Sequence, residues 1–188
     1  RVLMCDIVPR PDGGSFRGER SPGAGEAHRD RLGMAQQLRG GARLGGDHGR
    51  VTAGDGLAQA VPRDAVVSSD IGNNCAIGNA YPTFEAGRKY LAPGLFGPCG
   101  YGFPSILGAK IGNPDTPVIG FAGDGAFGIS MNEMVSVGRE DWPAITMVIF
   151  RNYQWGAEKR NTTLWYANNF VGTELDRDTT YAGIAKAC

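Results

Sequence analysis

The feature that most constrains the fold is a run of seven almost uninterrupted apolar and β-branched residues, Ala144 to Phe150. Such a run lacks the alternation of a half-exposed strand and is typical of a parallel strand buried on both faces. A second run, Pro117 to Ala122, lies upstream and ends at a glycine-rich turn, and a helix is expected between the two runs, from about Gly128 to Gly138. Strand–helix–strand units of this kind predict an α/β fold with a doubly wound parallel sheet.

The other elements predicted after residue 61 continue this alternation. A short buried strand follows the turn at Pro62, and two glycine-rich turns, near Gly72 and Gly100, each open a helix. The last residues before Cys188 also have a helical pattern. In chain order, we expect a strand at 65–69, a helix at 73–81, a turn and helix at 100–109, and a final helix at 179–188.

Residues 1–60 differ in composition from the rest of the chain. They contain 13 of the 30 glycines and 9 of the 15 arginines, none of the four lysines, and one aromatic residue, Phe16. Such a segment lacks the apolar bulk that offsets the loss of chain entropy on folding. We therefore expect residues 1–60 to be irregular, and we assign no chemistry to them. Two interpretations stay open, a linker and an out-of-frame translation of GC-rich codons, and an intact reading frame would exclude the second.

Charge and cysteine content argue against several classes of function. The chain has 19 basic and 19 acidic side chains, whereas nucleic-acid binding needs a surplus of Lys and Arg on one face. No apolar run reaches the ~18 residues of a membrane-spanning helix, and no segment resembles a signal peptide, so we expect a cytoplasmic location. The four cysteines form no CxxC pair, so a bound metal is expected to have oxygen ligands, which favours Mg²⁺.

Two oxygen-bearing side chains follow the two predicted buried strands. Asp124 stands between Gly123 and Gly125 at the end of the first strand, and Asn152 follows the second strand 28 residues later. Ligands of open α/β sheets bind beyond the carboxyl ends of the strands, so neighbouring strands would bring both side chains to one crevice. A carboxylate and an amide oxygen suit Mg²⁺, and a helix N-terminus behind glycines suits a diphosphate. Taken alone, Gly-Asp-Gly is also a common turn.

Taken together, these residues resemble the thiamine-diphosphate binding motif, in which Gly-Asp-Gly precedes an Asn by about 25–30 residues. Here 26 residues separate Gly125 from Asn152. The resemblance implies that Asp124 and Asn152 supply side-chain oxygens to Mg²⁺. It also implies that the backbone carbonyl of Gln154 is a third ligand and that the metal anchors the diphosphate of the cofactor.

Three longer strings narrow the resemblance to the sulfoacetaldehyde acetyltransferases, a family related to acetolactate synthase. They start at Ser69 (SDIGNNCAIGNAY), Leu91 (LAPGLFGPCGYG) and Phe150 (FRNYQWGAEKRNTTLW). The match runs over residues 61–188, which the resemblance identifies as a pyrophosphate-binding domain truncated at its C-terminus. The cofactor-binding residues that it implies are Gly72, Asn73, Asn74, Cys99, Gly100, Gly123, Gly125 and Ala126.

Cys99 departs from the pattern of this group, because its position carries a bulky apolar residue that props the cofactor in a bent conformation. Cys99 is smaller, and a buried filler is the alternative interpretation. Glu158-Lys159-Arg160 is expected to be a solvated loop rather than an anion-binding group. Trp155 is expected either in the core or lining a pocket beside the metal loop.

The resemblance further implies a thiamine-diphosphate-dependent acyltransferase that converts sulfoacetaldehyde and phosphate into acetyl phosphate and sulfite, in sulfonate catabolism. The glutamate that activates the cofactor is expected in a separate domain, usually from the partner subunit of a homo-oligomer, so we expect these 188 residues to be a fragment without turnover of its own. Small molecules are the expected partners, with no nucleic acid and no membrane. Two alternatives stay open: an acetolactate synthase-like decarboxylase or carboligase, and a non-catalytic phosphate- or nucleotide-binding α/β module.

Overall fold

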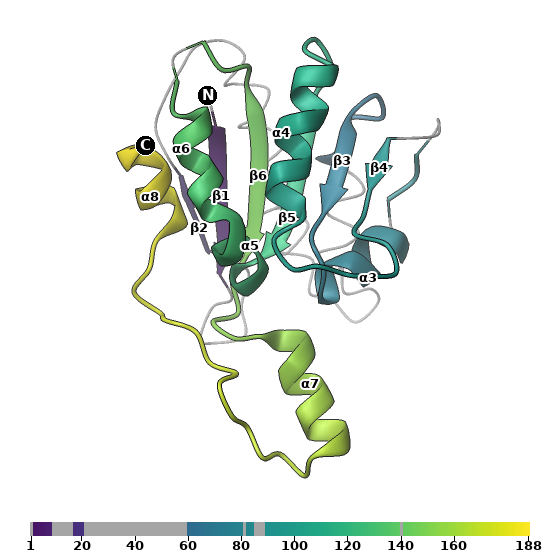
Figure 1. The fold of residues 1–188 in the computed structure, drawn as a ribbon, viewed down its shortest axis with the longest axis vertical. Helices are drawn as coiled ribbons and strands as arrows, with labels where there is room; N and C mark the ends of the chain where they lie inside the picture. The colour runs from purple at the N-terminus through teal and green to yellow at the C-terminus, as the bar shows by residue number, and fades with distance from the viewer. Residues whose placement is uncertain (1, 9–16, 21–59, 81, 85–88, 140) are drawn as a thin grey trace, which may run out of the picture.

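The computed structural model describes residues 2–8, 17–20, 60–80, 82–84, 89–139 and 141–188. Within these ranges the strands form one six-stranded sheet in the order β2-β1-β6-β5-β3-β4 (Figure 1). The strands are β1 (Val2–Val8), β2 (Arg17–Arg20), β3 (Val66–Ser69), β4 (Tyr90–Leu91), β5 (Val118–Gly123) and β6 (Ile145–Phe150). The helices are α3 (Asn73–Ala80), α4 (Gly102–Gly112), α5 (Asp124–Ser130), the 3₁₀ helix η1 (Met131–Glu133), α6 (Met134–Val137), α7 (Gly156–Trp165) and α8 (Tyr181–Ala187). Among the described residues, no helix combines the length and the apolar character needed to cross a bilayer.

The centre of the sheet is parallel and buried on both faces. β3 pairs with β5, and β5 pairs with β6 in a register that sets Gly123 opposite Phe150. Because successive side chains of a strand point to opposite faces, the apolar runs supply two separate cores. One core includes Val66, Val118, Ala122, Ile145, Met147 and Ile149, and the other includes Val67, Ile119, Phe121 and Val148.

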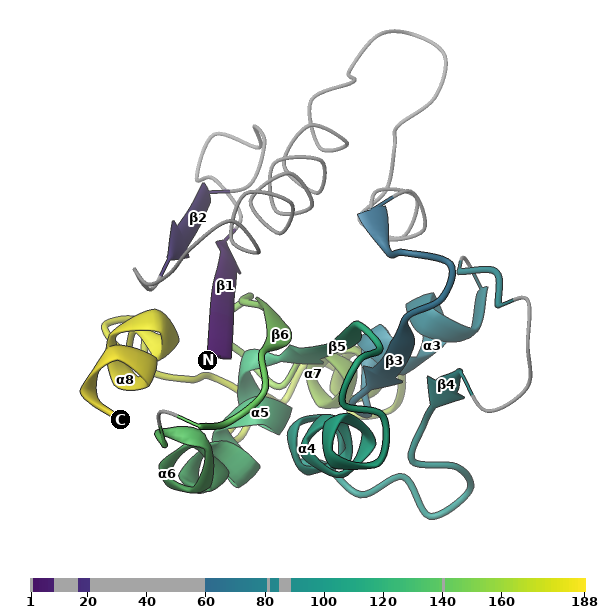
Figure 2. The same cartoon turned by 90° about the horizontal axis from the view of Figure 1, so that it is seen from above.

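Helices lie on both faces of this sheet (Figure 2). On one face, α4, α5, α6 and α8 pack over the first core and contribute Phe103, Phe127, Met134 and Tyr181 to it. On the other face lies α3, whose Gly78 sits so close to the second core that a Cβ there would lie 2.8 Å from Phe121 Cζ. The predicted class, an α/β fold with a doubly wound parallel sheet, is therefore confirmed.

The strands on which the sequence argument rests are confirmed, but the helix between them begins earlier than expected. The expected start at Gly128 is wrong, because the chain becomes helical at Asp124, directly after β5, and η1 interrupts it. The stretch GDGAFG has no helical apolar periodicity, so sequence patterning gave no sign of this early start. After the interruption, Met134 and Val137 are buried, whereas Val135 is 75% exposed.

Two stretches of the N-terminal segment contradict the expectation that residues 1–60 are irregular. β1 pairs in parallel with β6, and β2 pairs antiparallel with β1. The local apolar run of Val2–Val8 forms a strand beside the buried β6, although the composition of residues 1–60 as a whole opposes folding. Residues 9–16 and 21–59 lie outside the described residues, and the domain boundary near residue 61 stays a prediction.

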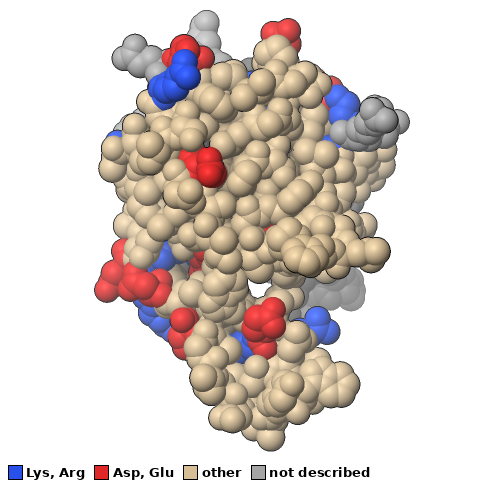
Figure 3. Space-filling view, viewed as in Figure 1, with Lys and Arg blue, Asp and Glu red and all other residues tan. Residues whose placement is uncertain are grey.

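Helix α7 stands apart from the sheet (Figure 1) and was not predicted. It contains Glu158-Lys159-Arg160, so the expectation of a loop there is wrong, and none of its residues is buried. The chain then returns to an antiparallel bridge between Gln154 and Glu174. Residues 155–175, hereafter the α7 arm, therefore leave and rejoin the body near the end of β6. Figure 3 shows an opening between the arm and the body.

Candidate functional site

The buried carboxylate of Asp124 links the ends of the two central strands. Asp124 is the first residue of α5 and is 3% exposed. Its Oδ2 accepts a 2.7 Å hydrogen bond from the backbone N–H of Tyr153, and its Oδ1 accepts a 3.1 Å bond from Gly125 N–H. Since Tyr153 follows Asn152, the structure brings the carboxylate to the loop that carries the other expected metal ligands. The predicted meeting of two neighbouring strand ends is confirmed.

The loop after β6 is fixed by hydrogen bonds within the loop and by others from the returning end of the α7 arm. The Asn152 Oδ1 atom accepts a 3.2 Å hydrogen bond from Gln154 N–H, and Tyr153 has a positive φ of 60°. The returning end of the α7 arm contributes two further backbone bonds, from Trp155 N–H to the carbonyl of Thr173 (2.8 Å) and from Leu175 N–H to the carbonyl of Tyr153 (2.9 Å). The expected ligands Asn152 and Gln154 therefore lie in a loop that hydrogen bonds fix at several points.

The side chains of Asn73 and Asn74, at the start of α3, lie beside the Gly-Asp-Gly turn and the start of α7. Gly72, with φ +101°, turns the chain into α3, so that a side chain there would be strained. The Nδ2 atom of buried Asn74 lies 3.1 Å from where a Cβ on Gly123 would stand. The Nδ2 atom of Asn73 lies 3.5 Å from the corresponding position on Gly156. Residues that the sequence grouped only by resemblance are thus neighbours in the fold.

Gly125 and Gly156 permit close approaches within this cluster. A Cβ on Gly125 would lie 2.8 Å from Trp155 Cε3, and a Cβ on Gly156 would lie 2.5 Å from Asn152 Nδ2. Real Cβ atoms do not make contacts this short, so a side chain at Gly125 would force Trp155 to shift and one at Gly156 would force Asn152 to shift. Ala126, in the first turn of α5, is 5% exposed, and its methyl group packs inward. Trp155 is only partly buried, and its ring packs on Gly125 in the Gly-Asp-Gly turn rather than in the core.

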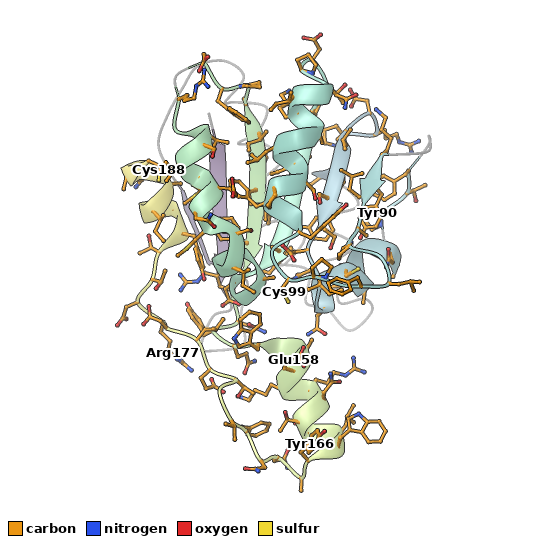
Figure 4. All side chains as sticks on the ribbon, in the orientation of Figure 1. Tyr90, Cys99, Glu158, Tyr166, Arg177 and Cys188 are labelled. Atoms are coloured by element: carbon orange, nitrogen blue, oxygen red, sulfur yellow. The ribbon has the colours of Figure 1, made fainter. Side chains whose placement is uncertain are left out.

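The turn of Cys99 and Gly100 joins the cluster through Asp70, which is not among the expected site residues. Asp70 Oδ1 accepts a 3.0 Å hydrogen bond from Gly100 N–H. Cys99 is exposed, so its interpretation as a buried filler is wrong. Although the residue is exposed, nearby protein atoms remove part of the water around the thiol and so raise the pKa of Cys99, and the negative charges of Asp70 and Glu158 raise it further. Figure 4 shows Cys99 above the first turn of α7, which carries Glu158.

The donor set of this cluster fits a hard divalent cation. Burial raises the pKa of the Asp124 carboxyl above its ordinary value, while the N–H donors of Tyr153 and Gly125 and the charge of Arg151 act in the opposite direction. Each carboxylate oxygen accepts one of these N–H bonds and keeps a second lone pair for a ligand. In the described part of the chain, no three His, Cys, Asp or Glu side chains gather to hold a metal ion. A cation at Asp124 would therefore depend on amide, carbonyl and phosphate oxygens, as Mg²⁺ does.

Two further residues support the site without a signal in the sequence. The hydroxyl of Tyr181, in α8, donates a 3.0 Å hydrogen bond to the backbone carbonyl of Asp124. The buried guanidinium of Arg151 lies over the Tyr153 ring, 4.8 Å from its centroid, and over the Tyr181 ring at 5.3 Å. The hydrogen bond from Tyr181 to Asp124 and the contact of Arg151 with the Tyr181 ring join segments distant in the chain, so only the folded structure reveals them.

Comparison with known proteins identifies the family. A family model described as "Thiamine pyrophosphate enzyme, C-terminal TPP binding domain" matches residues 70–188, which include every expected site residue. The chain belongs to this family. The expected cofactor, thiamine diphosphate, is confirmed at the level of the family, while the roles of individual residues and the metal stay predictions.

Individual relatives refine this assignment. The chain is 80% identical over 128 residues to a probable sulfoacetaldehyde acetyltransferase of Rhizobium meliloti (strain 1021), covering 68% of this chain and 22% of that protein. It is 74% identical over 132 residues to a sulfoacetaldehyde acetyltransferase of Roseovarius nubinhibens, covering 70% and 22%. Against the acetolactate synthase large subunit of Corynebacterium glutamicum, identity is 30% over 125 residues, covering 66% and 20%. The chain spans about a fifth of the length of these curated relatives.

Proposed function

We propose that this chain carries the metal–diphosphate site of a thiamine-diphosphate-dependent acyltransferase that converts sulfoacetaldehyde and phosphate into acetyl phosphate and sulfite. The observation that carries the proposal is the hydrogen bond from Tyr153 N–H to Asp124, which joins the two strand ends at the expected metal loop. The cofactor supplies the carbon chemistry when bound, and the protein supplies binding, orientation and electrostatics.

One set of residues in the site would bind the metal, and another set would bind the diphosphate. Asp124, Asn152 and the carbonyl of Gln154 would hold Mg²⁺, which neutralises part of the diphosphate charge. The amide groups of Asn73 and Asn74 lie beside the glycines of the same cluster and can donate to phosphate oxygens. The first turn of α5 begins at the end of β5, so its N–H groups other than that of Gly125, which bonds the Asp124 carboxylate, are available at the same end of the sheet.

Similarity to relatives favours sulfoacetaldehyde as substrate over the acetolactate synthase alternative. Three relatives named sulfoacetaldehyde acetyltransferase, one of them as probable, are 74–80% identical to this chain, and two others are 47% identical, against 30% for the acetolactate synthase of Corynebacterium glutamicum. At the higher identity most side chains around a ligand are shared, so substrate preference is expected to follow. We also propose small-molecule partners, homo-oligomeric assembly and a cytoplasmic location.

The proposal is tested first by binding. We expect calorimetry on the 188-residue chain to detect thiamine diphosphate binding that requires Mg²⁺, and to detect weaker or no binding of ATP with Mg²⁺. Preference for ATP would support the alternative of a nucleotide-binding module. In a longer polypeptide that contains this chain, product analysis with sulfoacetaldehyde and with pyruvate separates the two enzyme candidates, and acetolactate formation would favour the synthase.

A further inference from the structure

Asp70 is fully buried between the two glycine-rich loops of the site. It follows β3, is 0% exposed, and donates its own backbone N–H to the carbonyl of Phe121 in β5 at 2.9 Å. Its carboxylate accepts three backbone hydrogen bonds: Oδ1 from Ile71 at 2.8 Å and from Gly100 at 3.0 Å, and Oδ2 from Gly102 at 2.8 Å. Such multiple charge-assisted bonds are what a buried carboxylate requires.

These bonds connect segments that lie 30 residues apart in the chain. Ile71 belongs to the loop that leads through Gly72 to the asparagines at the start of α3. Gly100 belongs to the turn before α4, and Gly102 is the first residue of α4, so its N–H has no partner within that helix. The helix dipole of α4 adds a favourable interaction with the carboxylate. One side chain therefore fixes the distance between the asparagine loop and the Cys99–Gly100 turn.

The fit around Asp70 is tight. A Cβ on Gly102 would lie 3.0 Å from the backbone nitrogen of Asp70 and 3.1 Å from its Oδ2. Gly100 packs in turn against α5, since a Cβ there would lie 3.0 Å from Ile129 Cγ2. A shift of Asp70 would thus be transmitted to the turn and to the helix that begins at Asp124.

We propose that Asp70 is a positioning residue that couples the asparagine loop to the Cys99–Gly100 turn and so sets the affinity for thiamine diphosphate, without being a ligand of cofactor or metal. This inference rests on the proposed function. When the competent arrangement of the two loops is only partly populated, the apparent affinity falls by that fraction. Loss of the coupling should therefore weaken cofactor binding more than it weakens the fold.

The experiment compares Asp70→Asn with Asp64→Asn, which makes the same change at an exposed residue just before β3. Calorimetry with thiamine diphosphate and Mg²⁺ measures affinity, and hydrogen–deuterium exchange measures opening of each loop. For Asp70→Asn we expect about tenfold weaker binding, as if about a tenth of the molecules were competent. We also expect faster exchange in residues 71–75 and 99–103 together, without change in β5 and β6. Asp64→Asn should alter neither measurement.

Two results would overturn the inference: wild-type affinity in Asp70→Asn, or faster exchange in one loop only. If Asp70→Asn does not fold, Gly102→Ala tests the same contact from the other side, because it keeps the carboxylate and adds a methyl group against it. Unchanged affinity and exchange in folded Gly102→Ala would refute the coupling. If the wild-type chain binds no thiamine diphosphate, the proposed function fails, and the exchange of the two loops alone decides whether Asp70 couples them.

Discussion

Replacement of Gly125 by alanine is expected to disturb the site through Trp155, and Gly128 in the same helix offers a matched control. A methyl group on Gly125 would lie 2.8, 2.9 and 3.0 Å from three ring atoms of Trp155, whereas one on Gly128 would meet only the Tyr181 hydroxyl at 3.9 Å. Optimal carbon–carbon separations are about 3.5 Å or more, so the Trp155 ring must retreat by roughly 0.7 Å.

The expected magnitude follows from two opposing contributions. Alanine in place of helical glycine stabilises by up to about 1 kcal/mol, and this gain is common to both variants. Overpacking costs about 1–3 kcal/mol and applies only to Gly125→Ala. The free energies of unfolding of the two variants should therefore differ by about 1–3 kcal/mol. For a chain of this size, that corresponds to a difference in Tm of about 2–12 °C.

Thermal unfolding followed by circular dichroism, without cofactor, measures this difference. Gly128→Ala should unfold at or above the wild-type temperature, and Gly125→Ala clearly below Gly128→Ala. Equal Tm values for the two variants would refute the packing of Trp155 on the Gly-Asp-Gly turn. Calorimetry with thiamine diphosphate adds a second readout, because a displaced Trp155 also moves Gln154 and should weaken binding in Gly125→Ala only.

Three further predictions concern single contacts of the site. Asp124→Asn should abolish the Mg²⁺ dependence of thiamine diphosphate binding, because it removes the carboxylate charge that would hold the cation. Calorimetry with and without Mg²⁺ tests this expectation. An unchanged dependence on Mg²⁺ would contradict the assignment of Asp124 as a metal ligand. Tyr181→Phe removes the hydroxyl bonded to the Asp124 carbonyl and should cost about 1 kcal/mol, a Tm loss of about 2–4 °C in a melting experiment, with an unchanged Tm as the opposing result. Glu158→Gln should lower the pKa of the Cys99 thiol, since one negative charge that disfavours the thiolate is gone. Alkylation of Cys99, followed by peptide mass spectrometry, should then be faster at a pH below that pKa. An effect no larger than that of the exposed control Asp115→Asn would contradict the role of Glu158.

The central strands could be predicted because their signal is local. β5 and β6 are short apolar runs in which the first five residues are buried, and this pattern is visible in each run by itself. The helix α7 could not be predicted in this way, because it buries none of its residues. Its support comes instead from contacts with its own arm, such as the ion pair between Lys159 and Glu174 and the ring of Phe170 beside Lys159. Hydrophobic periodicity carries no information about such contacts.

The N-terminal strand was missed for a different reason. The average composition of residues 1–60 opposes folding, whereas β1 needs only the seven residues Val2–Val8 and a buried neighbour, β6. The side chain of Met4 is fully buried in the first core. The average over residues 1–60 therefore conceals the local apolar run of Val2–Val8, and pairing with β6 supplies the buried neighbour that this strand needs.

By itself, the sequence determined the α/β class and the chemical identity of the oxygen donors at Asp124 and Asn152. Both are local properties: runs of apolar residues decide which segments become strands, and residue type decides which atoms can bind a cation. Only the tertiary structure decided that β5 and β6 are neighbours, that Asp124 binds the loop after Asn152, and that Asp70 joins two loops. These facts depend on hydrogen bonds between residues about 30 positions apart, and their geometry exists only once the sheet has brought the strand ends together.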